Sequence, residues 1–262
     1  MTANIYVVMH KKTEIPVIDG YKSLFVGSCG MGDRSGIDCF DDDGLNISEK
    51  NKNYCELTGL YWMWKNTSDD IEGLCHYRRY FTKSWISVDC KYYLCRKDLE
   101  NLFAEYDVVM PVKRYYKEKV VNAVEIAPNM DDIVEMRRAI HMVCPDYSEA
   151  YEAYLYGNKC YLYNMFIMKK ELLDQYCQWL FSILDFIESE YAVDNSDPYR
   201  SRLFGFLSER LIYVWVTKNI PKEKIKEYRV VKTDENPIWL IGQDVKNILR
   251  NVIFHIKQGL KR

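Results

Sequence analysis

Hydrophobic and polar positions follow two periods along the chain, and the two alternate. Short runs rich in β-branched and aromatic residues, bounded by turn residues, predict buried strands. They lie at 5–9, 70–75, 107–110, 161–168 and 228–233. Apolar residues at three- and four-residue spacing predict amphipathic helices between them. These lie at 48–66, 99–106, 131–142, 147–155, 170–191 and 202–216. Strands alternating with helices predict an α/β fold with a central, largely parallel sheet flanked by helices.

Two of these segments carry further detail. In the helix predicted over 48–66, Ser48 is placed to cap the N-terminus, and apolar residues recur at helical spacing. In the strand predicted over 161–168, Asn164 stands in the middle of an apolar run. An unpaired amide there is costly, so Asn164 either bonds a sugar hydroxyl or satisfies a backbone loop.

Composition narrows the class of protein. The 262 residues fit one large domain or two small ones, and 48% hydrophobic residues are enough for a sizeable core. The net charge of −2 argues against a nucleic-acid-binding domain, which usually has a basic surface. The 22 Tyr and 6 Trp residues either fill the core or offer faces on which sugars stack.

The nine cysteines are scattered, without a CxxC pair, so zinc-ligand spacing is absent. No secretory signal and no apolar run of membrane-spanning length is recognised. We therefore expect reduced thiols and a cytoplasmic protein, with peripheral attachment to the inner face of the cell membrane as a further option.

The segment 73–81 holds the densest candidate chemistry. The predicted strand leads directly into His76, Tyr77, Arg78 and Arg79. Ligands of open α/β sheets bind beyond the carboxyl ends of strands, and guanidinium groups suit a diphosphate. The alternative is a pair of arginines that form surface ion pairs, and the sequence does not separate the two.

The glycine- and aspartate-rich segment 27–46 predicts a loop. It contains neither a dinucleotide-binding glycine motif nor a phosphate-binding P-loop. Its Asp41, Asp42 and Asp43 are a conceivable set of metal ligands. An acidic surface loop is the interpretation that we favour.

The C-terminal segment 244–262 combines an apolar stripe with positive charge. The stripe consists of Val245, Ile248, Leu249, Val252, Ile253 and Ile256, and the cations are Lys246, Arg250, Lys257, Lys261 and Arg262. A basic amphipathic helix of this kind can lie in a membrane interface. A terminal helix packed on the domain is the alternative, and the one that we favour.

Several short motifs, in the same order and spacing, are similar to those of a known family. They lie at 10–12, 46–48, 51–62, 76–81, 163–168 and 205–210. With these motifs the chain resembles, from about residue 5 to about residue 220, the DUF4422 family of bacterial polysaccharide-biosynthesis proteins. That family is counted among the glycosyltransferases of capsule, exopolysaccharide and O-antigen clusters.

The resemblance implies a GT-A-like glycosyltransferase domain over 1–243, followed by the helix over 244–262. It implies transfer of a hexose, galactose or galactofuranose first, from a UDP-sugar to a lipid-linked glycan. GT-A enzymes ordinarily hold the donor diphosphate through a metal on a DxD motif. Here His76-Tyr77-Arg78-Arg79 follows the strand instead, so we predict an inverting enzyme in which the arginines replace the metal. A divalent metal stays conceivable.

The remaining residue roles follow from the motifs. Glu209 is the first candidate for a general base on the acceptor hydroxyl, against an ion pair with Arg202 or Arg78. Glu56 and Asp131 are reserves. Asn53 and Glu56 lie three residues apart, on one helix face. The predicted donor-binding residues are His10, Lys11, Asn53, His76, Tyr77, Arg78, Arg79 and Asn164.

Two other functions compete with this one. A non-catalytic subunit that binds nucleotide sugars or glycans in a polysaccharide assembly complex also explains the aromatic residues and the arginines. Only the enzyme needs a carboxylate beside the anomeric carbon. A nucleotidyl or phosphoryl transferase is disfavoured, because a glycine-rich phosphate loop is absent.

Overall fold

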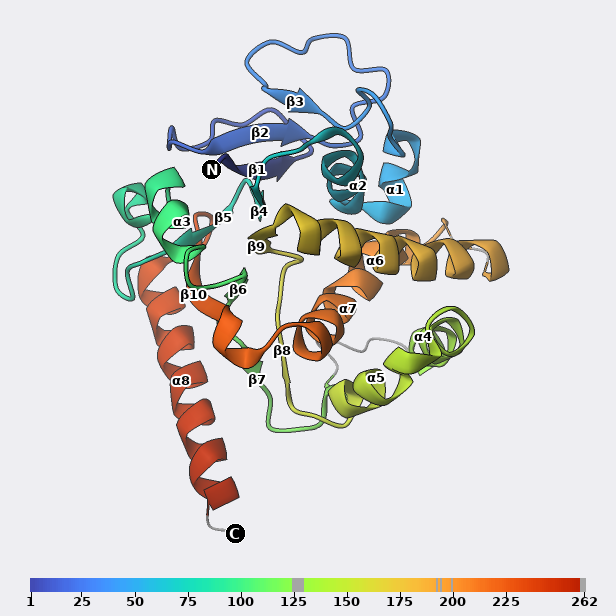
Figure 1. The fold of residues 1–262 in the computed structure, drawn as a ribbon, viewed down its shortest axis with the longest axis vertical. Coiled ribbons are helices and arrows are strands. Elements are labelled where there is room, and N and C mark those ends of the chain that lie inside the picture. The colour runs from blue at the N-terminus through green and yellow to red at the C-terminus, as the bar shows by residue number, and fades with distance from the viewer. Residues whose placement is uncertain (124–129, 192, 194, 199, 260–262) are drawn as a thin grey trace.

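The computed structural model describes residues 1–123, 130–191, 193, 195–198 and 200–259. Its centre is an eight-stranded mixed sheet in the order β3-β2-β1-β4-β5-β10-β6-β9, in which β9 also pairs with β4 (Figure 1). The strands are β1 Ala3–Met9, β2 Tyr21–Phe25, β3 Cys39–Phe40, β4 Ile71–His76, β5 Arg79–Thr82, β6 Val108–Pro111, β9 Phe166–Lys169 and β10 Ile225–Lys232. A separate ribbon pairs β7 Arg114–Tyr115 with β8 Lys159–Cys160.

The helices are α1 Asn51–Tyr54, α2 Leu57–Asn66, α3 Arg96–Leu102, α4 Met130–Val143, α5 Ser148–Leu155, α6 Lys170–Glu190, α7 Leu203–Asn219 and α8 Pro237–Gly259. The predicted fold class, α/β with a central sheet and flanking helices, is confirmed. Parallel pairing holds for β3, β2, β1 and β4 and for β10 with β6. The strands β5 and β9 run antiparallel to their neighbours.

The parallel half of the sheet positions the site. Because β1 and β4 run side by side in the same direction, with Val8 opposite His76, both end at one edge of the sheet. A two-residue turn, Tyr77 and Arg78, then leads from β4 into β5, so His76 and Arg79 face each other across the turn. The segment 76–79 is therefore fixed by strand pairing on both sides.

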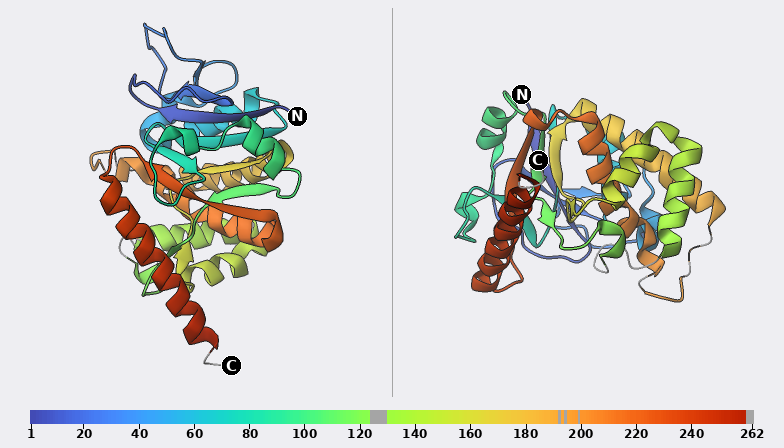
Figure 2. Two further views of the ribbon diagram at one scale, coloured as in Figure 1. Left: turned by 90° about the vertical axis from the view of Figure 1, so that its left-hand side faces the viewer. Right: turned by 90° about the horizontal axis from the view of Figure 1, so that it is seen from below.

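Most of the core lies on one face of the sheet, beneath α2, α6 and α7 (Figures 1 and 2). Gly59 of α2 makes this packing close, since a Cβ there would meet Val26 at 2.9 Å. A smaller cluster with Leu99 and Phe103 covers the other face. The single amphipathic pattern of 170–191 becomes α6, whose buried residues repeat at helical spacing.

Three sequence predictions are wrong in detail. The segment 48–66 is not one helix, because Cys55 has a φ of +52° and separates α1 from α2. Ser48 does not cap a helix; its hydroxyl donates to Asp41 at 2.6 Å. Asn164 is not in a strand either: it lies in a turn before β9 with a φ of +46°. Periodicity cannot detect a single left-handed residue, since one residue barely changes the pattern around it.

The C-terminal helix begins before residue 244, at Pro237, and Lys261 and Arg262 lie outside the described residues. Its C-terminal half projects past the rest of the molecule (Figures 1 and 2). Within the described part of the chain, no helix is both long and apolar enough to cross a membrane.

Candidate active site

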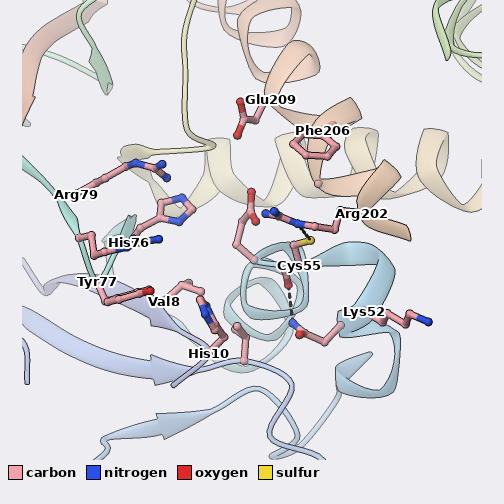
Figure 3. Close-up of a pocket in the computed structure, with 15 residues that line it drawn as sticks. Val8, His10, Lys52, Cys55, His76, Tyr77, Arg79, Arg202, Phe206 and Glu209 are labelled. Carbon is pink, nitrogen blue, oxygen red and sulfur yellow. Dashed lines mark hydrogen bonds between the residues drawn. The ribbon is translucent and has the colours of Figure 1, made fainter. Parts of the chain in front are cut away.

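A cavity of about 620 Å³ opens at the edge where β1 and β4 end. Its walls come from β1, the β4–β5 turn, α1 and the start of α7 (Figure 3). The predicted site residues that line it are His10, Glu56, His76, Tyr77, Arg78, Arg79 and Glu209. Segments that are more than a hundred residues apart in the sequence are thus brought to one place.

The β4–β5 turn supplies the cations. Arg79 lies over the ring of Tyr163, 4.5 Å from its centre. Arg78 is exposed and pairs with Asp234 at 2.7 Å. Each of the two alternatives drawn from the sequence therefore applies to one arginine. Arg78 forms a surface ion pair, whereas Arg79 forms no ion pair with a carboxylate of the described residues.

His76 is held in one tautomer. Its Nε2 lies 2.6 Å from the carbonyl oxygen of Tyr163, which can only accept, so Nε2 carries the proton and Nδ1 is left as an acceptor. Burial lowers the pKa of His76 against the opposing effect of Glu56, and Arg79 lowers it further. His10 stacks edge-on against Tyr77 at 5.5 Å, and burial followed by the charge of Lys11 lowers its pKa. Both imidazoles therefore favour the neutral form.

The helical wall depends on a close approach of α1 and α7. A Cβ at Gly205 would meet the Cβ and Sγ of Cys55 at 3.3 Å. Arg202, at the start of α7, donates from Nε to that sulfur at 3.4 Å and covers the ring of Phe206. The glycine therefore lets the two helices bring Glu56 and Glu209 to one wall of the cavity.

Glu56 and Glu209 form an interacting pair of carboxyl groups. Asn164 donates from Nδ2 to Glu56 at 2.6 Å, and to Ser208 at 2.7 Å. Burial raises the pKa of Glu209 to about 7, and the negative charge of Glu56 adds to the shift. The backbone N–H of Tyr163 and the charges of Arg79 and Arg202 act in the opposite direction. A carboxylate with this pKa can accept a proton near neutral pH.

Strained backbone surrounds this pair. Within the described residues, the non-glycine positions with positive φ are Cys55, Tyr163 and Asn164, at +52°, +80° and +46°. Such conformations cost roughly 1–3 kcal/mol each and cluster at functional sites. Each of the three contacts the pair or precedes one of its members in the chain. Neither Cys55 nor Tyr163 was a predicted site residue, because ordinary residue types do not reveal unusual backbone angles.

Four predicted residues lie outside the cavity lining. Lys11 is exposed, 5.7 Å from the ring of Tyr77. Asn53 donates to Asn195 at 2.8 Å and to the carbonyl of Ser201 at 2.7 Å, which ties α1 to the segment before α7. Asn164 is buried behind Glu56, and Asp131 is exposed in the first turn of α4.

The side chains of Asp41, Asp42 and Asp43 all form hydrogen bonds or ion pairs within the protein. Asp41 is fully buried and accepts hydrogen bonds from Gly27, Ser28, Ser48 and Thr58. Asp42 and Asp43 pair with Arg34. In the part of the chain that the structure describes, no group of three or more His, Cys, Asp or Glu side chains is arranged to hold a metal ion.

Two comparisons with known proteins bear on this site. The model of a family described as a domain of unknown function, DUF4422, matches residues 4–220. Among solved structures, the apo structure of a bifunctional glycosyltransferase, WbbM, is similar with a TM-score of 0.79 and 27% sequence identity. The match covers 90% of this chain but 46% of WbbM, so this chain spans about half the length of that protein. No curated protein sequence matches the chain.

Proposed function

The chain belongs to the DUF4422 family, and from the chemistry of its cavity we propose that it is a glycosyltransferase that uses a UDP-sugar donor. The single observation that carries this proposal is that Glu209 and Arg79 line the same cavity, and that the pKa of Glu209 is raised to about 7. Glu209 can accept a proton, and Arg79 can stabilise a leaving diphosphate. The likeness to WbbM supports the same class of reaction.

The proposed reaction is an inverting transfer. Glu209 takes the proton from an acceptor hydroxyl, the hydroxyl oxygen bonds to the anomeric carbon, and the bond from that carbon to the diphosphate breaks. UDP leaves with the electron pair, and Arg79 stabilises its charge. The cavity volume of about 620 Å³ is within the range of small-molecule binding sites and is large enough for a nucleotide sugar.

The finer parts of the proposal extend the family resemblance. They are a hexose donor, galactose or galactofuranose first, and a lipid-linked glycan acceptor in polysaccharide synthesis. We further propose that donor binding needs no DxD-bound metal. The cations Arg79 and Arg202 and the neutral imidazoles of His10 and His76 are the groups that could contact the donor.

Titration calorimetry with UDP, with and without EDTA, tests this function. We expect EDTA to leave most of the affinity in place. Arg79→Ala should weaken binding about ten- to a hundredfold, because a charge-assisted hydrogen bond contributes roughly 1.5–3 kcal/mol. Arg78→Ala is the matched control, since Asp234 already pairs with Arg78 at the surface, and it should have the smaller effect.

Three results would count against the proposal. Loss of UDP binding in EDTA would contradict the metal-independent part. UDP affinity unchanged by Arg79→Ala would remove the arginine from the donor site. Binding of UDP-sugars without turnover, across donors and acceptors, would favour the alternative of a non-catalytic binding subunit.

A further inference from the structure

The C-terminal helix α8 is attached to the body of the protein through polar residues. Asp244 forms an ion pair with Arg229, which is only 3% exposed. Asn247 accepts from the backbone N–H of Tyr115 at 3.0 Å and donates to the carbonyl of Lys113 at 2.8 Å, so it joins the edge of β7. A surface helix normally packs its apolar stripe against the core and leaves its polar face in water. Among the described side chains between Asp244 and Ile253, the orientation is reversed.

Leu240 packs against the body at 5% exposed, but six other apolar residues of α8 face away from it. Each is at least 42% exposed, and they recur at three-, four- and seven-residue spacing along one side of the helix. We call them the α8 stripe: Ile238, Val245, Ile248, Leu249, Val252 and Ile253. The helix that carries the stripe is 23 residues long and extends past the sheet (Figures 1 and 2). A contiguous exposed apolar surface of this kind marks an interaction site.

Beside the stripe, a second cavity of about 530 Å³ lies between α8 and strands β7 and β10. We call it the α8 cleft. Its charged lining is five cations and one carboxylate, Asp244. The cations are Arg114, Arg229, Lys232, Lys246 and Arg250.

Most of this positive charge is uncompensated. Asp244 is paired with Arg229, and Lys232 pairs with Glu235 at 2.6 Å. Arg114, Lys246 and Arg250 form no ion pair with the residues that the structure describes. Two buried nitrogens in the lining, Arg229 Nη2 and Arg114 Nε, have no hydrogen-bond partner in the described part of the chain. Buried cationic nitrogens are rarely without a hydrogen-bond acceptor. The cleft therefore favours an anionic ligand.

The rim of the cleft carries two tryptophans, Trp85 and Trp239, which are 51% and 52% exposed. Tryptophan is enriched where one side of a protein surface is apolar and the other is wet, as at the interface of a membrane. Ile248 belongs both to the stripe and to the lining of the cleft, so the stripe adjoins the cations and the tryptophans along α8. Together they match a ligand surface that is apolar and anionic at once.

We propose that α8 lies in the interface of an anionic membrane, with the α8 stripe among the acyl chains and lipid phosphate groups in the α8 cleft. A second copy of this chain fits the surface less well, because a two-fold interface would place a second set of the same cations against the first. A helix held in this way binds through its buried apolar area and through its attraction to anionic lipids.

The proposal goes beyond the transfer reaction but has a consequence for it. Tyr163 lines the α8 cleft, and its backbone N–H bonds to Glu209 in the first cavity. The two cavities therefore share a wall. A membrane held at α8 would place the first cavity beside any acceptor that is anchored in that membrane.

Co-sedimentation of the full chain with vesicles tests the proposal. Vesicles of phosphatidylcholine alone are compared with vesicles that also contain phosphatidylglycerol, and we expect strong binding only to the second kind. The double variant Lys246→Gln/Arg250→Gln should lower partitioning roughly fivefold for each cation removed. The double variant Leu249→Glu/Val252→Glu should lower it more than tenfold, because the apolar contribution is lost and charge repulsion is added.

Two controls match these changes without touching α8. Lys97→Gln removes an exposed cation from α3, and Val134→Glu changes a residue of α4 that is 52% exposed. Both should bind vesicles as the unchanged protein does. Circular dichroism of each variant distinguishes a loss of binding from a loss of structure.

Four outcomes overturn the proposal. The first is no preference for anionic vesicles, and the second is equal binding by the α8 variants and their controls. The third is complete displacement from vesicles by inorganic diphosphate, which would make the cleft a site for soluble phosphate compounds. A dimer seen by light scattering, dissolved by Leu249→Glu/Val252→Glu in a protein that ignores vesicles, would instead assign the stripe to a second copy. None of these results depends on transfer activity, so the proposed function can fail or hold separately.

Discussion

Asp41 and Glu209 are both acidic side chains withdrawn from water, but their surroundings are opposite. Asp41 accepts from two backbone N–H groups and from the hydroxyls of Ser28, Ser48 and Thr58. Donors on every side stabilise its negative charge, and in return the carboxylate ties the 27–46 loop to the start of α1 and α2. Such saturation leaves no lone pair for a substrate.

Glu209 faces a second carboxylate instead. Burial and the charge of Glu56 raise the pKa of Glu209 to about 7, although Arg79 and Arg202 oppose the shift. The protein therefore places a carboxyl group where the charged form is disfavoured, and strained residues such as Tyr163 hold the surroundings in position. A saturated carboxylate stabilises a fold, whereas an under-compensated one can exchange a proton. By this contrast we assign Asp41 a structural role and Glu209 a role in proton transfer.

The largest expected effect comes from Glu209→Gln. If Glu209 is the general base, the variant should lose roughly 10²–10⁴-fold in transfer rate, because the amide cannot take the acceptor proton. UDP affinity should stay near that of the unchanged protein. A UDP-release assay under saturating donor measures the rate. Transfer within about threefold of the unchanged protein would remove Glu209 from the mechanism.

Stability should respond to Glu209→Gln in a way that depends on pH. The folded pKa of about 7 is above the ordinary value of 4.5, so the folded state binds more protons and stability falls as pH rises between these values. Above pH 7 the variant should therefore melt at a higher temperature than the unchanged protein. This advantage should vanish below pH 4.5. A lower melting temperature at all pH values would show that Glu209 is structural.

The sequence predicted the residues of the site better than it predicted the local conformation of the backbone. The family motifs supplied His76, Arg79 and Glu209 as site candidates, and all three line one cavity. The long helix α6 followed from periodicity, since many residues repeat the same pattern. The positive φ angles of Cys55 and Asn164 were not predicted, because they depend on contacts with α7 that are distant in sequence.

The C-terminal helix shows the same limit. Periodicity identified the stripe and its flanking cations, which are local properties. It could not show which side of the helix faces the body. That depends on Asp244 meeting the buried Arg229, and on Asn247 reaching the edge of β7. The pattern alone favoured a helix packed on the domain, which would bury its apolar side. The long-range polar contacts instead turn the polar side of α8 toward the body.

Asp41→Asn is expected to have the second-largest effect, and on stability alone. The amide can accept at one oxygen, and its NH₂ group points at donors. Loss of charge-assisted hydrogen bonds should lower the free energy of unfolding by about 2–4 kcal/mol. Urea denaturation measures it. Asp43→Asn is the matched control, because Asp43 is 59% exposed in its pair with Arg34, and it should cost less than about 1 kcal/mol. Equal stability of the two variants would contradict the structural role of Asp41.

The smallest effect, and the sharpest test of the comparison, is the shift in pH dependence caused by Glu56→Gln. A base is active when it is deprotonated, so transfer by the unchanged protein should rise with pH and reach its midpoint near 7. Removing the charge of Glu56 removes the second cause of the raised pKa and leaves the first, which is burial. The midpoint should therefore move to lower pH without reaching 4.5.

The glutamine keeps its Oε1, which can still accept from Asn164, so the wall of the cavity should stay in place. Glu149→Gln, an exposed change on α5, should leave the midpoint where it was. The rate is measured over pH at saturating donor, which reports the enzyme with substrate bound. A rate lost at every pH would make Glu56 the base in place of Glu209. An unchanged midpoint would show that burial alone sets the pKa of Glu209, and that the two carboxyl groups do not act as a pair.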